Sequence, residues 1–362
     1  MRKETLTLPN GNTVEAFAPV IVSASRSTDI PAFYARWFME HLQDGYVIWV
    51  NPFNQQPSYV SFKNTRAIVF WTKNPKPILP YLPKLDELGL NYYFQYTLND
   101  YEQEGFEPNV AKLQTRLDTF KKLVDKLGPQ RVIWRCDPLI ITPKLGVEGL
   151  LHKISALSEQ LCGLTNKIVF SFVDVKGYRK VRNNLIRTGN YTSENVLDAE
   201  PNSEQRTQLV EGLVQLRDNW RKRGWNFSLA TCAEGFDYQE YGILHNRCID
   251  AELMSECFNH DQKLISYLDG FKPQSRQLDI FEALEEQSNT SLKQTVYDYK
   301  KFKDKGQRDE CGCVESKDIG MYNTCPHNCV YCYANTSTDL VAKNRKKYML
   351  MSESIIPFKV KR

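Results

Sequence analysis

The residues best suited to chemistry lie near the end of the chain, in the stretch Cys325-Pro-His-Asn-Cys329-Val-Tyr-Cys332. The three cysteines are spaced C-x3-C-x2-C, so one tight loop can direct three thiolates at a single centre. Thiolates are the usual ligands of iron–sulfur clusters, which take four of them. Three from one loop would leave one iron without a protein ligand, and an open metal position is where chemistry occurs. The stretch therefore predicts a reactive iron–sulfur site.

Zinc is the first alternative for this stretch. Short zinc motifs usually join a C-x2-C pair to a second pair of cysteines or histidines, which closes a tetrahedron. Here there is one C-x2-C pair, a further cysteine four residues before it, and His327 inside the loop. The spacing favours a cluster over zinc, with His327 as part of the loop structure.

A second group of cysteines could also bind a metal. Two of its members lie just before the last expected strand, one ends the neighbouring strand, and one follows soon after it: Cys311, Cys313, Cys232 and Cys248. Four thiolates would complete a second, fully ligated [4Fe-4S] cluster, and zinc would fit them as well. The alternative for Cys248 is a small buried hydrophobe. Three other cysteines have apolar neighbours and are expected in the core: Cys136, Cys162 and Cys257.

The ten cysteines of this 362-residue chain favour metal ligation over disulfides, because five of them fall within residues 311–332. The N-terminus is basic but lacks an apolar segment, so no secretory signal is expected. No run of about 18 apolar residues occurs, which argues against a membrane partner. We expect a protein of the reducing cytoplasm. The net charge of +4 permits an anionic partner without indicating one.

The elements that must position these groups alternate between strands and helices. Eight short apolar runs are expected as strands: 20–24, 46–50, 67–72, 92–97, 131–135, 167–173, 226–231 and 319–323. Since helical patterns separate most of them, the sequence predicts an α/β fold, specifically a parallel (β/α)8 TIM-like barrel. The connection between 46–50 and 67–72 is only weakly helical, so a distorted or partial barrel is the alternative.

The chain divides into five expected segments. They are an N-terminal hairpin around Asn10-Gly11 in 1–18, barrel strands one to seven in 19–267, a polar and partly helical excursion in 268–310, a cysteine-rich cluster segment with the last barrel strand in 311–340, and a basic tail in 341–362.

Polar residues follow seven consecutive expected strands at the end where barrel enzymes place their active sites. They are Ser23, Ser25, Arg26, Asn51, Thr72, Lys73, Asn74, Gln95, Thr97, Arg135, Asp137, Asp174, Cys232 and Glu234. Each could instead cap the next helix. Lys73 and Arg135 suit capping poorly, because a cation opposes the dipole at a helix N-terminus. They suit a carboxylate or phosphate ligand.

From end to end, the chain resembles a bacterial family known only as a domain of unknown function. The matching stretches are SASRSTDIPAFY, NPFN, FWTKNP, VIWRCDPL, ATCAEG, CID and CGCVESKDIGMYNTCPHNCVYCYAN. This resemblance implies no activity.

The cysteine loop, with Tyr331 before its last cysteine, is similar to the motif of radical S-adenosylmethionine (radical SAM) proteins. A partial likeness to spore photoproduct lyase-like members adds Thr72-Lys73-Asn74-Pro75 and, more loosely, Thr97, Glu107-Pro108 and Arg116-Leu117. The resemblance implies a [4Fe-4S] cluster on Cys325, Cys329 and Cys332. It also implies that the fourth iron takes the amino and carboxylate groups of SAM.

Two departures accompany this likeness. In radical SAM proteins the cluster loop follows the first barrel strand, whereas here it follows the last. Since the last strand of a closed barrel neighbours the first, we hypothesise a circularly permuted radical SAM barrel. The chain also lacks the Gly-Gly-Glu motif that helps to hold the SAM amino group in that superfamily.

The sequence therefore predicts an iron–sulfur enzyme that reductively cleaves SAM to start radical chemistry on an unidentified substrate. Its electron donor would be a reductant such as flavodoxin or ferredoxin. The expected residues for binding SAM or substrate are Ser25, Arg26, Lys73, Asn74, Gln95, Arg135 and Tyr331, and those for polar or proton-transfer roles are Asp137, Asp174 and Glu234. The spore photoproduct lyase likeness favours a nucleic-acid or nucleotide substrate by analogy.

Two functions from other classes remain as alternatives. One is a zinc- or cluster-stabilised nucleic-acid-binding protein with a basic C-terminal surface, which would bind in a salt-dependent way without SAM. The other is a two-cluster electron-transfer protein. The polar residues at the strand ends favour an enzyme over both.

Overall fold

The fold is built on an eight-stranded parallel sheet with the strand order β11-β10-β9-β8-β7-β6-β3-β12. The computed structural model describes residues 1–232, 234–270, 304 and 311–358. The strands of this sheet are β3 (Ile21–Ala24), β6 (Ala67–Thr72), β7 (Asn91–Thr97), β8 (Val132–Leu139), β9 (Lys167–Phe172), β10 (Ser228–Thr231), β11 (Leu244–His245) and β12 (Lys317–Asp318). The α/β prediction with a large parallel sheet is confirmed.

The last strand of this sheet lies beside the first. β12 pairs in parallel with β3, with Lys317 opposite Val22 and Asp318 opposite Ser23. The chain after β11 also contacts the chain before β12, because the Val314 N–H donates to the Ile249 carbonyl at 3.2 Å. The prediction of 319–323 as the last strand is wrong, because the pairing with β3 ends at Asp318. The segment that leads to the cysteine loop does lie beside the first strand, as predicted. Closure into a complete TIM barrel stays a prediction.

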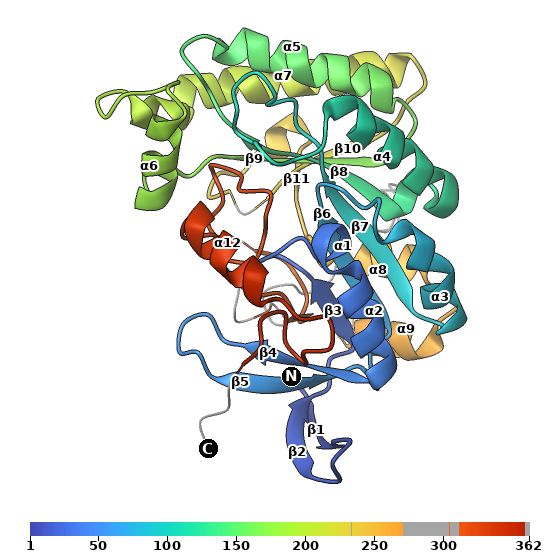
Figure 1. Ribbon diagram of the computed structural model, residues 1–362. Coiled ribbons are helices and arrows are strands. Elements are labelled where there is room, and N and C mark those ends of the chain that lie inside the picture. Colours follow the sequence, from blue (N-terminus) through green and yellow to red (C-terminus); the bar gives the residue numbers. More distant parts are fainter. Residues whose placement is uncertain (233, 271–303, 305–310, 359–362) are drawn as a thin grey trace, which may run out of the picture.

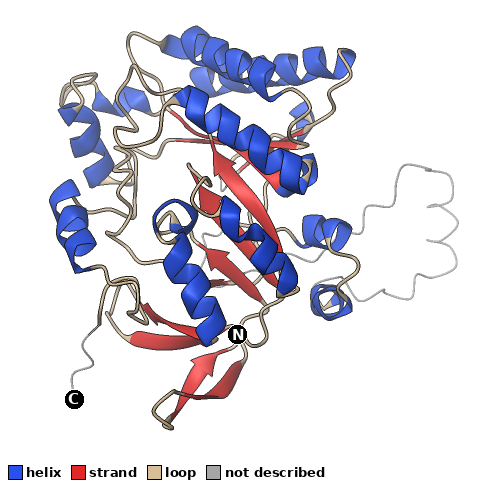
Figure 2. Cartoon of the chain, turned by 45° about the vertical axis from the view of Figure 1, so that its right-hand side comes forward, coloured by secondary structure: helices blue, strands red, loops and turns tan. Residues whose placement is uncertain are grey.

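A second sheet with the order β1-β2-β5-β4 contains one segment that we expected in the barrel. Its strands are β1 (Lys3–Thr7), β2 (Thr13–Phe17), β4 (Tyr46–Val50) and β5 (Pro57–Ser61). The prediction of 46–50 as a barrel strand is wrong, because β5 follows it closely and pairs with it in antiparallel register. The predicted N-terminal hairpin is confirmed, with Gly11 at a φ of +84° in its turn. Figure 2 shows this smaller sheet below the larger one.

The helices lie around the larger sheet (Figures 1 and 2). They are α1 (Ile30–Phe33), α2 (Ala35–Asp44), α3 (Leu82–Glu87), α4 (Leu113–Leu127), α5 (Gly146–Leu161), α6 (Arg179–Arg187), α7 (Ser203–Lys222), α8 (Ala251–Cys257), α9 (Gln262–Asp269) and α12 (Thr338–Lys347). Short 3-10 turns span Leu79–Tyr81, Pro129–Arg131, Val196–Ala199 and Gln239–Tyr241. The longest of the described helices, α7, begins at a capping box in which Asn202 and Gln205 bond reciprocally.

Strand side chains alternate between two buried clusters, as the pleat of a strand requires. Phe70 and Phe94 stack in the larger cluster, 4.9 Å between ring centroids, with helices packed over them. Val69 and Val169 belong to the smaller cluster, which also contains cysteines of the second group. The sheet is therefore buried on both faces, as parallel sheets generally are.

The C-terminal segment packs against the first two helices (Figure 1). The Trp37 indole of α2 donates to the Ser352 carbonyl at 2.7 Å. The Arg345 guanidinium of α12 lies 5.4 Å from the Tyr34 ring centroid. Part of the predicted basic tail is therefore packed on the domain. The predicted excursion of residues 268–310 falls largely outside the described residues. Among the helices that the structure describes, none has the length and hydropathy to cross a bilayer.

Candidate functional site

The cysteine loop leaves the sheet directly after β12, at the edge where the loop after β3 also emerges. Asp318 joins the two. Its carboxylate accepts hydrogen bonds from Ser23 Oγ at 2.7 Å, from the Arg26 N–H at 2.7 Å and from Ser27 Oγ at 3.0 Å. We did not predict a role for Asp318. The sequence predicts the last strand at 319–323, so Asp318 stands before that predicted strand instead of at its end.

Gly320 allows the chain after β12 to approach the loop after β3 closely. A Cβ at this position would lie 1.8 Å from Ser25 Oγ and 2.7 Å from Ser25 Cβ, and Ser25 Oγ is itself held by the Ser27 and Thr28 N–H groups. We therefore expect Gly320→Ala to destabilise the fold by about 1–3 kcal/mol, as overpacking does. Urea unfolding measures this. Gly235→Ala is the control, since its Cβ would meet no atom within 4 Å. Equal stability of the two variants would contradict the described packing.

The three loop thiols share one buried environment. Cys329 is buried, and Cys325 and Cys332 are half-buried. Burial raises the pKa of Cys325 to about 12, and the charges of Asp29 and Cys332 add to the rise. Burial also raises the pKa of Cys329 well above its usual range. Thiolates at these positions therefore need a nearby cation, which a bound metal provides.

His327 fixes the loop from within. Its Nε2 lies 2.8 Å from Asp29 Oδ2. The other oxygen of Asp29 caps α1 by accepting the Ala32 N–H at 2.9 Å, and Oδ2 also accepts the Lys73 N–H at 2.8 Å. One buried carboxylate thus joins the cysteine loop to α1 and to the end of β6.

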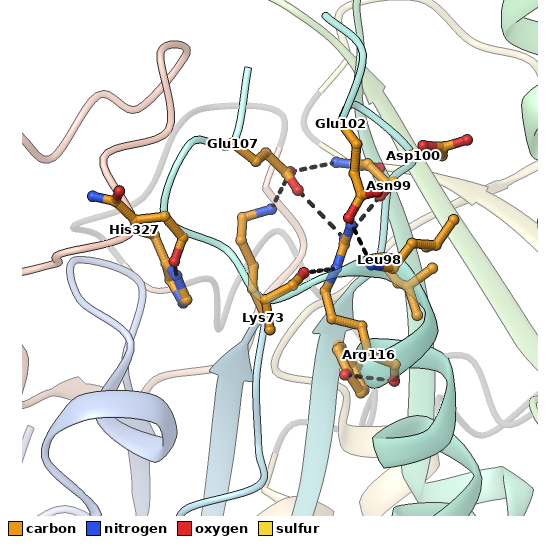
Figure 3. A network of polar contacts seen from close by, with 12 residues as sticks. Lys73, Leu98, Asn99, Asp100, Glu102, Glu107, Arg116 and His327 are labelled. Atoms are coloured by element: carbon orange, nitrogen blue, oxygen red, sulfur yellow. Dashed lines mark hydrogen bonds and ion pairs between the residues drawn. The ribbon is translucent and has the colours of Figure 1, made fainter. Parts of the chain in front are cut away.

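A buried ionic network contacts the loop through Tyr331, and Figure 3 shows its members Lys73, Glu107 and Arg116. Glu107 pairs with Lys73 Nζ at 2.8 Å and with Arg116 Nη1 at 3.4 Å. Tyr331 Oη donates to the same carboxylate and accepts from Lys73 Nζ at 2.9 Å. Burial alone would raise the pKa of Glu107, but the two cations more than offset it and lower the pKa. Lys73, predicted as a cofactor or substrate ligand, therefore bonds to the residues that hold the loop.

A second set of predicted residues meets within β7 and β8, because β8 continues to Leu139, beyond the predicted end at 135. Arg135 forms an ion pair with Asp137 and donates to Gln95 Oε1 at 3.2 Å. The same Arg135 Nη1 donates to Cys248 Sγ at 3.0 Å, and Cys248 Sγ lies 3.5 Å from Cys232 Sγ. These predicted residues therefore face the second cysteine group.

The remaining predicted residues lie in turns at the strand ends. The Asn74 N–H donates to Thr72 Oγ1 at 2.9 Å, and Asp174 Oδ1 accepts the Gly177 N–H at 2.7 Å. Glu234 Oε1 accepts the Phe172 N–H at 2.9 Å. Their roles in binding and proton transfer stay predictions.

Helix α6 supplies two loop contacts that the sequence did not indicate. The Lys180 ammonium donates to the Tyr333 carbonyl, and Asn184 Nδ2 donates to the Val330 carbonyl at 3.2 Å. Both bonds reach backbone of the cysteine segment from outside the sheet. Loop carbonyls carry no sequence signature, so this support could not have been read from the chain.

All ten cysteines are free thiols. Cys136 is buried in the core as predicted. The same prediction is wrong for Cys162, which is exposed just after α5, and Cys257 is half-buried. Within the described residues, no group of three or more His, Cys, Asp or Glu side chains is arranged to hold one metal ion. In an iron–sulfur cluster each thiolate binds a different iron, so the absence of a single-ion site does not bear on a cluster site.

A pocket of about 570 Å³ lies at the edge formed by the amino ends of the strands, opposite the edge from which the cysteine loop leaves. Its lining includes Arg66, Asn91 and Arg131, which stand at the starts of β6, β7 and β8. In parallel barrels this edge serves stability rather than catalysis. The pocket is therefore not part of the site at the cysteine loop.

The comparisons with known proteins give a family without an assigned activity. A family model described as "Domain of unknown function (DUF1848)" matches residues 21–334. No curated protein and no solved structure matches the chain. The matched span runs from β3 through the cysteine loop, which confirms the predicted uncharacterised family; the radical SAM likeness stays a prediction. The chain therefore belongs to the DUF1848 family.

Proposed function

We propose that this protein is a cytoplasmic iron–sulfur enzyme of the radical SAM type. The observation that carries the proposal is the position of the C-x3-C-x2-C loop. It leaves the carboxyl end of β12, beside the first strand of a parallel sheet, where enzymes of this architecture place their active sites. The order of the strands supports the circularly permuted arrangement of such a barrel.

The residues around the loop fit a thiolate-bound cluster with one open iron. The donor set is three cysteines, one fewer than a closed [4Fe-4S] cluster requires. Two buried acceptors near it, Thr28 Oγ1 and Asn328 Oδ1, have no hydrogen-bond partner among the described residues. They could receive N–H groups of a ligand, which supports a site for SAM, whose amino group needs acceptors.

When bound, such a cluster supplies an electron for reductive cleavage of SAM, which yields methionine and, after hydrogen abstraction from substrate, 5′-deoxyadenosine. The chain's own residues fix the site. Asp29 and His327 hold one end of the loop, and Glu107 and Tyr331 hold the other. Because these contacts are buried, water has little access to the loop from their side.

The substrate that we propose is a nucleic acid or nucleotide. The likeness to spore photoproduct lyase-like proteins supports a nucleic acid or nucleotide by analogy alone. We expect the electron donor to be flavodoxin or ferredoxin. Asp137, Asp174 and Glu234 are proposed for polar or proton-transfer roles near the strand ends.

The test is SAM turnover by protein purified without oxygen and reconstituted with iron and sulfide. With a strong reductant, we expect 5′-deoxyadenosine and methionine to accumulate in equal amounts. An intact, reduced cluster that yields neither product would overturn the proposal. Salt-dependent binding to nucleic acid by a zinc-containing protein would then favour the binding-protein alternative. Reversible redox without SAM cleavage would favour electron transfer.

A further inference from the structure

Four cysteines outside the loop converge from three separate segments. Cys232 directly follows β10, Cys248 follows β11, and Cys311 and Cys313 precede β12. The Sγ atoms of Cys232 and Cys248 lie 3.5 Å apart. The Cys313 thiol lies within hydrogen-bonding reach of the thiols of both Cys248 and Cys311. Residues up to 81 positions apart in the chain, from Cys232 to Cys313, thus bring their thiols together.

These sulfurs accept hydrogen bonds. Arg135 Nη1 and Asn246 Nδ2 donate to Cys248 Sγ at 3.0 and 3.2 Å. The Ile249 N–H donates to Cys313 Sγ at 3.3 Å. A neutral thiol is a weak acceptor, whereas hydrogen bonds to sulfur are an established means of tuning metal-bound thiolates. Three donors directed at two sulfurs therefore suit thiolates better than thiols.

Two buried cations flank the group. Arg135 contacts Cys248, and Arg26 lies near Cys313 and Cys248. Arg26 Nη2 is buried without a hydrogen-bond partner among the described residues, although its guanidinium lies 5.2 Å from the Trp71 ring centroid. Carboxylates also act on both cations: Asp318 and Asp304 on Arg26, and Asp137 in its ion pair with Arg135. Four thiolates on Zn²⁺ or on a [4Fe-4S]²⁺ cluster carry a net charge of about −2, and the two guanidinium groups place positive charge beside it.

We propose that Cys232, Cys248, Cys311 and Cys313 hold a second metal centre of the thiolate-bound class, an iron–sulfur cluster or zinc. The alternative is that Cys248 and Cys313 are small residues of the smaller apolar cluster. That alternative accounts for their burial but not for the guanidinium groups and N–H donors directed at them. Since the sulfurs are not arranged around one ion, binding requires their side chains to rotate. This proposal does not depend on SAM chemistry at the loop.

The test separates the two cysteine groups by mutation. A variant with Cys325, Cys329 and Cys332 all changed to alanine lacks the loop ligands, so any metal that it retains belongs elsewhere. We expect it to keep about four irons and four sulfides per chain if the centre is a cluster, or about one zinc if it is a structural zinc site. Adding Cys248→Ala and Cys313→Ala should remove this metal. Adding Cys162→Ala and Cys257→Ala should not.

A folded loop variant without stoichiometric metal would overturn the proposal, as would metal that survives Cys248→Ala and Cys313→Ala. If the loop variant does not fold, the reverse experiment decides. Cys248→Ala with Cys313→Ala in the otherwise native chain should lose one centre and keep the loop's iron. An unchanged metal content there would also overturn the proposal. SAM turnover is not used as a readout, so failure of the radical SAM proposal would leave this test intact.

Discussion

Cys329→Ala is expected to abolish 5′-deoxyadenosine formation and to lower the iron content by about four atoms per chain, the content of one [4Fe-4S] cluster. Cys329 is the central and most buried thiol of the loop, 8% exposed. Its loss leaves two thiolates, too few to retain a cluster against dissociation. The measurement is iron, sulfide and product analysis on protein reconstituted in parallel with the native chain.

The control for this variant is Cys162→Ala, which removes an exposed thiol that belongs to neither cysteine group. It should leave iron content and turnover unchanged. If Cys329→Ala retained native iron and native turnover, the loop would not be the cluster site. If Cys329→Ala lost both its iron and all its secondary structure, the variant would be unfolded. Cys325→Ala would then replace it, because Cys325 is less buried.

Glu107→Gln is expected to lower the free energy of unfolding by about 3–5 kcal/mol, the cost of breaking a buried ion pair from one side. The change leaves Lys73 and Arg116 buried without their shared carboxylate. It also weakens the contact that Tyr331 makes from the cysteine loop. We therefore also expect the metal affinity to fall about 10- to 100-fold, as it does when other residues that orient metal ligands are changed. The cluster occupancy should fall with it.

The pH dependence of this effect follows from the lowered pKa of Glu107. Its ordinary value is 4.5, so the stability that it contributes is present above that pH and is lost as the pH falls through its lower value in the folded protein. The difference in stability between native protein and Glu107→Gln should therefore shrink below pH 4.5. Urea unfolding at several pH values measures it.

Glu87→Gln is the matched control, because Glu87 is exposed and pairs with the exposed Lys84 at 3.0 Å. Exposed pairs contribute about 0–1 kcal/mol. A Glu107 variant as stable as the Glu87 variant would show that the buried network does not support the loop.

The fold was predictable where strands are long and buried. The apolar runs at 67–72, 92–97 and 167–173 appear as β6, β7 and β9 with nearly the expected bounds. The assignment of 46–50 to the barrel failed because an apolar run does not specify its partner, and a nearby strand pairs with it first. β11 was missed because it has two residues, both exposed, and therefore no hydrophobic pattern.

The site was predictable from spacing but not from contacts. The cysteine positions indicated both groups as candidate metal sites: the loop by its short spacing, and the second group by the places of its members beside neighbouring strands. The partners of Lys73 could not be inferred, because they lie 34 and 258 residues away in the chain. The tethers made by Asp29 and Asp318 were missed for the same reason: each joins segments separated by more than 290 residues.

The most direct test of the central claim is an EPR spectrum of the protein, purified without oxygen and reduced, recorded with and without SAM. We predict a [4Fe-4S]⁺ signal that changes when SAM is added, because the loop provides three thiolates and leaves one iron open. The same signal should be lost in Cys329→Ala. A reduced cluster whose spectrum is unaffected by SAM, or stoichiometric zinc without iron, would contradict the account.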